Sequence, residues 1–209
     1  MAEPSTIDRK ALVWRWRHFV LFSGPEWHRL LSLRTAIFVV EQACPYLEAD
    51  EKDPECWHLE LLHGEQLIGT LRVAPPGVSY PECSIGRVAV HADYREYGLG
   101  RDLMLRALDF CDARWPAGVR LSAQAYLTAF YESMGFVMTH GPYYEDNIEC
   151  IYLKKNKNSS RCRACPYRTG DTCGLLKMYI ARLSFRITAN NFGLPRILPA
   201  MVHGESCRA

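Results

Sequence analysis

The chain has 209 residues, of which 48% are hydrophobic and 23% are charged. This length and composition suit one folded domain with an appendage and exclude a largely disordered chain. The net charge of +2 averages over two unlike parts: residues 1–153 contain 14 Lys and Arg against 21 Asp and Glu, whereas residues 154–209 contain 11 against 2. We therefore expect a body over residues 1–153 and a basic, Cys-containing C-terminal extension over residues 154–209.

No apolar run reaches the roughly 18 residues that a membrane span requires, so we expect no span. The first ten residues, MAEPSTIDRK, contain acidic side chains and precede no long apolar core. This pattern is unlike a secretory signal and indicates a cytoplasmic protein. The basic residues of the extension are not interleaved with aromatic ones in the manner of a nucleic-acid site, so we expect no nucleic-acid partner.

The first half of the chain reads as a strand, a helix and three further strands. Alternating bulky and polar residues predict a strand over Ala11–Phe22, and helical spacing predicts a helix or pair of helices over Glu26–Gln42, ended by Pro45. An acidic loop, Glu48–Glu55, follows. The next expected strands, of which the first two form a hairpin, are Cys56–Leu62, Leu67–Ala74 and Cys83–Val90.

The second half alternates helices and strands. The spacing predicts a helix from Gly98 to Ala113, then a strand over Gly118–Ala125, a short helix over Leu127–Met134, and strands over Gly135–His140 and Cys150–Leu153, with the turn-rich segment GPYYEDN between the last two. Helices that interrupt a mostly sequential sheet indicate the α/β class, with a mixed, mostly antiparallel sheet, one parallel crossover and flanking helices.

A glycine-containing turn lies between the strand that ends at Val90 and the helix that begins near Gly98. A helix that starts directly after a strand presents unpaired N–H groups and the positive end of its dipole. Gly98 and Gly100 let the backbone approach a ligand closely, and Arg95 and Arg101 add positive charge. This combination predicts a diphosphate site.

Other phosphate motifs fit this turn less well. A dinucleotide fingerprint needs a third glycine where Leu103 stands, and a P-loop needs Lys and Ser or Thr where Arg101 and Asp102 stand. Glycines used only for turn geometry are the remaining alternative.

The turn resembles the coenzyme A pyrophosphate loop, R-x-x-G-x-G, of the GNAT acetyltransferase superfamily. About thirty residues on, AFYESMGF supplies the Tyr followed by Gly-Phe that this superfamily also carries. The segments RTAIFVVEQACPYLEAD, WHLELL, IGRVAV and AQAYLTAFYESMGF are similar to the ElaA-like branch. The resemblance covers residues 12–153 and implies a GNAT-like fold with the extension outside it.

The resemblance implies acetyl transfer from acetyl-coenzyme A to a small-molecule or peptide amine, and it leaves homodimer formation open. It implies that backbone groups of Val88, Ala89 and Val90 pair with the pantetheine arm, with the Val88 N–H as an oxyanion donor. Tyr131 would be the general acid that protonates the departing thiolate. The diphosphate would be held by Arg95, Glu96, Tyr97, Gly98, Leu99, Gly100 and Arg101.

The general base is left open between Glu41, His58 and a water relay. Glu41 follows an apolar run where burial would raise its pKa, or it is a solvated helix residue. His58 has an ordinary pKa suited to neutral pH, or it is a satisfied histidine of the sheet. The acidic loop would attract a cationic amine, or would simply be solvated. Analogy alone assigns three positions to the substrate pocket, namely Arg34, Gln124 and Tyr143 or Tyr144. A non-catalytic acyl-coenzyme A binding module, with the tail contacting a partner or metal, is the alternative function.

The nine cysteines fall into two groups. Five are scattered through the body and indicate buried thiols, namely Cys44, Cys56, Cys83, Cys111 and Cys150. The tail contains Cys162, Cys165 and Cys173 in a C-x₂-C-x₇-C pattern, with His203 and Cys207 far downstream. Because the second half of a zinc signature is missing at short spacing, we expect no metal site. A redox pair, free thiols and, with lower weight, a zinc or iron–sulfur site stay open. Leu175–Ile187 is predicted to form a basic amphipathic helix, for which packing against the acidic body is favoured over a membrane or partner.

Overall fold

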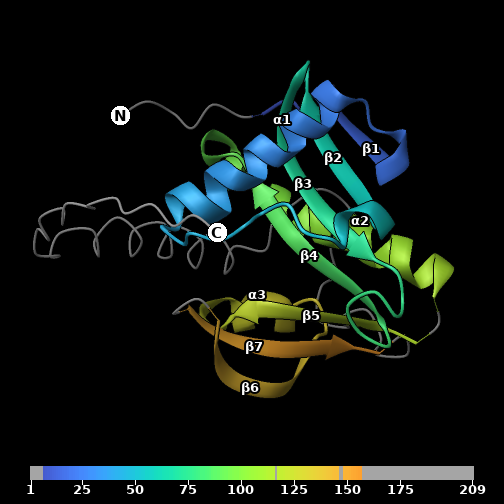
Figure 1. Cartoon of the computed structure of the whole chain (residues 1–209), viewed down its shortest axis with the longest axis vertical. Coiled ribbons are helices and arrows are strands. Elements are labelled where there is room, and N and C mark those ends of the chain that lie inside the picture. Colours follow the sequence, from blue (N-terminus) through green and yellow to red (C-terminus); the bar gives the residue numbers. More distant parts are fainter. Residues whose placement is uncertain (1–6, 116, 146–147, 157–209) are drawn as a thin grey trace, which may run out of the picture. The chain divides into compact units, whose positions relative to one another are not determined.

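The computed structural model describes residues 7–115, 117–145 and 148–156. In this part of the chain seven strands form one sheet in the order β1-β2-β3-β4-β5-β7-β6, with helices packed against it (Figure 1). Neighbouring strands are antiparallel except β4 and β5, which are parallel. The predicted α/β class and mixed, mostly antiparallel sheet are confirmed.

Every predicted strand is present, and the ends change most in the first, the sixth and the seventh, the last of which covers eight residues in place of the predicted four. The first strand ends at His18 because Phe19–Leu21 form a 3-10 turn, η2. The sixth continues to Glu145, so the expectation of a turn over GPYYEDN is wrong for most of that segment. Pairing with the neighbouring strand, Tyr143 opposite Cys150, overrides the local Gly-Pro signal. The strands are β1 Leu12–His18, β2 Trp57–His63, β3 Gln66–Ala74, β4 Cys83–Val90, β5 Val119–Gln124, β6 Val137–Glu145 and β7 Ile148–Lys155.

The predicted first helix consists of two parts. Helix α1 covers Gly24–Thr35 and begins with a capping box between Ser23 and Glu26, whose carboxylate accepts the Ser23 N–H at 2.9 Å. It continues as a π-helical turn, η3, over Ala36–Glu41. The other helices are α2 Leu99–Arg114 and α3 Thr128–Glu132, with short 3-10 turns η1 Arg9–Ala11, η4 Asp53–Glu55, η5 Ala92–Tyr97 and η6 Ala125–Leu127.

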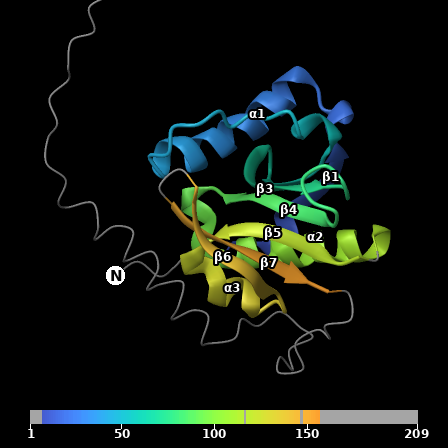
Figure 2. The ribbon, with the colours of Figure 1, turned by 60° about the horizontal axis from the view of Figure 1, so that its bottom comes forward.

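The two faces of the sheet bury separate apolar clusters. Helix α1 covers one face and α2 and α3 lie on the other (Figure 2). The α1 cluster contains Leu30, Leu33 and Ile37 against the sheet residue Ala89. The larger cluster includes Leu99, Leu103, Ala107 and Phe110, whose three- and four-residue spacing places them on one side of α2. The sheet is therefore covered on both faces at β3 and β4, where the candidate site lies.

None of the helices in the described part of the chain combines the length and apolar character of a membrane span. The basic extension, with Cys162, Cys165, Cys173 and the predicted helix Leu175–Ile187, lies outside the described residues apart from its first three positions, of which Lys154 and Lys155 end β7. The boundary between residues 153 and 154 therefore stays a prediction.

Candidate active site

Strands β4 and β5 pair over only two positions, Cys83 with Val119 and Ser84 with Arg120. Beyond these positions the strands diverge (Figure 1), while β4 stays paired with β3 on its other side as far as Val90. One edge of β4 therefore carries peptide groups with no described strand beside them, which are available to an extended ligand. The residues predicted to pair with pantetheine, Val88, Ala89 and Val90, lie on this stretch.

A β-bulge interrupts β4 within the same stretch. Thr70 lies opposite Ala89 and Arg72 opposite Gly86, so Arg87 and Val88 together face the single residue Leu71. Arg87 has a φ of 54°, a left-handed conformation that costs a side-chain-bearing residue about 1–3 kcal/mol. A bulge takes peptide groups out of the regular ladder. It occurs at the residue predicted to supply the oxyanion donor, Val88.

The sequence predicted that the helix α2 starts directly after the strand β4, but a short turn separates the two. The 3-10 turn η5 intervenes and ends at Gly98, whose φ of 73° favours glycine. The N–H groups of Arg101 and Asp102 point back to the Gly98 carbonyl, so α2 starts at the predicted place. A side chain added at Gly100 would meet no atom within 4 Å. The first turn of α2 thus offers helix N–H groups beside open space, which suits a diphosphate.

The two arginines of this loop contact different elements. Arg95 donates to both carboxylate oxygens of Glu41, at 2.5 and 2.6 Å, and to the Val90 carbonyl at 3.1 Å. Arg101 donates to Ser133 Oγ at 2.9 Å and so joins the start of α2 to the residue that follows α3. Arg95 therefore lies beside the end of the π-helical turn, and the partner of Arg101, Ser133, lies two residues in sequence from Tyr131.

Tyr131 is held firmly in place on α3. It is 7% exposed and belongs to the same buried cluster as Leu99. The rings of Phe130 and Phe136 meet its ring edge to face, at 5.1 and 5.9 Å between centroids. Burial raises the pKa of Tyr131 above its ordinary value, so the phenol stays protonated at neutral pH and keeps a proton to donate. Its assignment as general acid stays a prediction.

The two candidate bases have the environments of the non-catalytic alternatives. Glu41 is not buried: its side chain is 38% exposed, and it is paired with Arg95. His58 is fully buried beside Phe22 and Trp27, and its Nε2 lies 3.3 Å from the Asp53 carbonyl. Burial lowers the pKa of His58 to about 4, away from the expected neutral range. This burial argues against a role for His58 as the base.

A buried ion network, which the sequence did not reveal, lies beside the bulge. Arg34 is 1% exposed and donates to Glu48 Oε1 at 2.5 Å and Asp53 Oδ1 at 2.9 Å. Arg72 also binds Asp53 Oδ1, at 2.8 Å, and Arg87 binds Glu48 Oε1 at 3.0 Å. Burial alone would raise the pKa of Asp53, but hydrogen bonds and charges from Arg34 and Arg72 outweigh it and lower that pKa. The network joins α1, β3 and β4.

This network corrects two expectations. The acidic loop is not simply solvated, since Glu48 and Asp53 are 4% and 2% exposed. It is fastened to the sheet, and Tyr46 adds a hydrogen bond to Glu48. Arg34 does not line a substrate pocket, because its guanidinium is enclosed by these carboxylates. The acidic positions Asp50 and Asp53 are visible in the sequence, but their partners Arg72 and Arg87 lie too far along the chain to be matched by spacing.

The remaining predicted pocket residues lie at the C-terminal half of the sheet. Gln124, at the end of β5, donates to the Gln42 side chain at 3.1 Å and so reaches across to the end of the π-helical turn. Tyr143 is half-buried and its hydroxyl lies 2.5 Å from Ser122 Oγ, whereas Tyr144 is 75% exposed. Of this pair, Tyr143 is the residue whose side chain contacts β5.

The five body cysteines are buried, as predicted. No group of His, Cys, Asp or Glu within the described ranges is arranged to hold a metal ion.

The sequence model of the acetyltransferase (GNAT) family matches residues 26–136, which are more than half of the chain. The chain belongs to the GNAT acetyltransferase family. A UPF0039 protein of Synechocystis is 39% identical over 142 residues, which are 67% of this chain and 92% of that protein. Protein ElaA of Escherichia coli is 35% identical over 145 residues, 68% of this chain and 95% of ElaA.

Solved structures agree with this assignment. An acyl-CoA N-acyltransferase from Pseudomonas aeruginosa has a TM-score of 0.67 and 39% identity, and the match covers 69% of this chain and 99% of that one. The GNAT fold is one that supports acyl transfer from acyl-coenzyme A, and the resemblance to the ElaA-like branch is confirmed.

Proposed function

We propose that the protein transfers an acetyl group from acetyl-coenzyme A to a primary amine by direct attack of the amine. One observation carries the proposal: the free edge of β4, with its bulge at Arg87 and Val88, is followed through the short turn η5 by the glycine turn that starts α2. A peptide edge for an extended chain and helix N–H groups for a diphosphate are thus arranged in series on one stretch of backbone.

The residues present fit the cosubstrate. The space beside Gly100 accommodates a group close to the first turn of α2, and Arg101 is fixed at that turn by Ser133. Acetyl-coenzyme A supplies the activated acyl group as a thioester. The Val88 N–H stabilises negative charge on the acyl oxygen, an interaction of about 3 kcal/mol. Tyr131 protonates the leaving sulfur, and Arg95 with Arg101 neutralises the diphosphate.

The test combines coenzyme A binding, followed by calorimetry, with thiol release from acetyl-coenzyme A in the presence of polyamines, amino acids, aminoglycosides or peptide N-termini. The Gly100→Asp variant places a carboxylate in the proposed diphosphate space, and we expect the Kd for coenzyme A to rise at least about tenfold. Gly24→Asp is the matched control, because Gly24 also begins a helix and also faces open space.

Three outcomes separate the hypotheses. Binding with amine-dependent thiol release supports the proposed transferase. Binding without turnover across the panel identifies a non-catalytic acyl-coenzyme A module. No heat of binding, or equal effects of the two aspartate variants, rejects the proposed site.

A further inference from the structure

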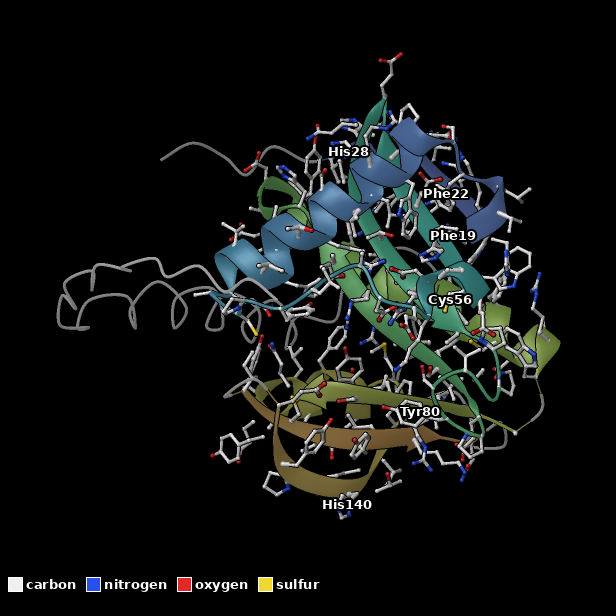
Figure 3. All side chains as sticks on the ribbon, in the orientation of Figure 1. Phe19, Phe22, His28, Cys56, Tyr80 and His140 are labelled. Atoms are coloured by element: carbon white, nitrogen blue, oxygen red, sulfur yellow. The ribbon has the colours of Figure 1, made fainter. Side chains whose placement is uncertain are left out.

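Strands β5, β7 and β6 form one half of the sheet. On the face that α1 covers at β3 and β4, this half carries polar and aromatic side chains. Val119, Leu121 and Ala123 alternate along β5 into the cluster beneath α2 and α3. Ser122 and Gln124 therefore point to the opposite face. Tyr152 lies opposite Ser122 on β7, and Tyr143 comes from β6. Tyr80 and His140, labelled in Figure 3, border the same half-sheet, with ring centroids 6.1 and 6.2 Å from Tyr152.

Ser122 shares its face of β5 with Gln124, two residues further along the strand. The Gln124 side chain donates to the Gln42 side chain at 3.1 Å, and the neighbouring Glu41 binds Arg95 of the segment between β4 and α2. Because β4 and β5 are not paired beyond Ser84 and Arg120, this part of β5 lies beside the unpaired edge of β4.

A chain of three polar groups starts at this serine. Tyr143 Oη lies 2.5 Å from Ser122 Oγ and donates to Glu145 Oε2 at 3.3 Å. A phenol has one proton, so when Tyr143 donates to Glu145 the short contact must be donated by Ser122. The lone pairs of Ser122 Oγ then stay available as acceptors. The ring of Tyr143 stacks on Tyr152 at 4.6 Å and 13°, which fixes the middle of the chain.

We propose that Ser122, Tyr143 and Glu145 form the proton exit for the amine, in a role for which Glu41 and His58 are poorly placed. This inference rests on the proposed transferase function. As the C–N bond forms, an N–H bond of the attacking amine breaks and its proton passes to Ser122 Oγ. The Ser122 proton passes to Tyr143, the Tyr143 proton to Glu145, and the exposed Glu145 releases it to water. Tyr131 delivers a separate proton to the departing sulfur and regains it from solvent.

The hydroxyl of Tyr143 is suited to pass a proton on rather than to carry a permanent charge. Burial raises the pKa of Tyr143 above its ordinary value. The phenol therefore stays neutral and can accept one proton while giving up another. Glu145 is an exposed carboxylate at the end of β6, where exchange with solvent is fast.

The deciding variant is Tyr143→Phe, which removes the middle hydroxyl and keeps the ring that stacks on Tyr152. We expect kcat to fall about tenfold to a hundredfold, with the Kd for coenzyme A and the melting temperature unchanged. Added imidazole should restore part of the rate, because a diffusing base replaces the interrupted relay, and the solvent deuterium isotope effect on kcat should change. Ser122→Ala should behave likewise. The matched control is Tyr144→Phe on the same strand, which removes an exposed hydroxyl and should leave all of these readouts unchanged.

The outcomes distinguish the relay from the function on which it rests. If the wild type releases thiol and Tyr143→Phe keeps a rate within twofold of it, without stimulation by imidazole, the relay alone is overturned. A loss of rate accompanied by a loss of coenzyme A binding or of thermal stability would assign a structural role to Tyr143 and also overturn it. Absence of amine-dependent thiol release from the wild type would overturn the proposed transferase and the relay together.

Discussion

Replacing Arg34 by Leu should destabilise the fold strongly, because the buried carboxylates around it would lose a partner. Arg34 makes hydrogen bonds to the side chains of Glu48 and Asp53 and to the Glu48 carbonyl, and all three residues are at most 4% exposed. Removing one member of a buried ion pair typically costs about 3–5 kcal/mol. Arg72 and Arg87 would remain as partners, so we expect a loss at the lower end, about 3 kcal/mol.

The measurement is urea unfolding followed by circular dichroism at pH 7. With a denaturant slope of about 1–3 kcal/mol per M, the midpoint should fall by about 1–3 M. The melting temperature should fall by about 6–12 °C. Arg29→Leu on the exposed side of the same helix is the matched control, for which we expect a change within about 0.5 kcal/mol. Equal midpoints for the two variants would refute the view that the network is a buried, mutually dependent unit.

Three further predictions concern single side chains. The pKa of His58 is lowered to about 4 in the folded protein, so between pH 4 and 6.5 only the unfolded state binds a proton at this residue, and stability rises with pH by up to about 3 kcal/mol. His58→Gln should flatten this rise in urea titrations at several pH values, and an unchanged slope would contradict the prediction. Tyr131→Phe should lower kcat about a hundredfold with little change in the KM for acetyl-coenzyme A, and steady-state thiol release that stays near the wild-type rate would remove Tyr131 as the acid. Glu41→Gln should leave kcat within about threefold and tighten coenzyme A binding in calorimetry, because Arg95 loses a competing partner; a loss of kcat near a hundredfold would instead make Glu41 the base.

The parts of the fold that could be predicted are those encoded in local sequence. The β2–β3 hairpin and the helix after Gly98 follow from periodicity and turn residues within a few positions of one another. The glycine turn likewise lies where Gly98 and Gly100 predicted it, and its assignment to a diphosphate stays a prediction. These elements depend little on distant contacts.

The parts that could not be predicted depend on pairing across the chain. The left-handed φ of Arg87 has no local signature, since arginine rarely adopts it, and the bulge is defined only by the register against β3. The burial of Asp53 requires Arg34 and Arg72, which are 19 residues away on either side. The path of β6 through Pro142 to Glu145 is likewise decided by β7.

Because of the π-helical turn at Ala36–Glu41, deleting or inserting a residue there would change which side chains face the site at the end of the first helix. Its wider winding accommodates these six residues, with the Gln42 N–H reaching the Ile37 carbonyl at 3.2 Å and the Cys44 N–H reaching Val39 at 3.1 Å. A chain one residue shorter there could still wind helically, but the two side chains that meet Arg95 and Gln124 would rotate by about 100° around the axis. A deletion in this turn should therefore change what faces the acyl donor more than most replacements of single residues would.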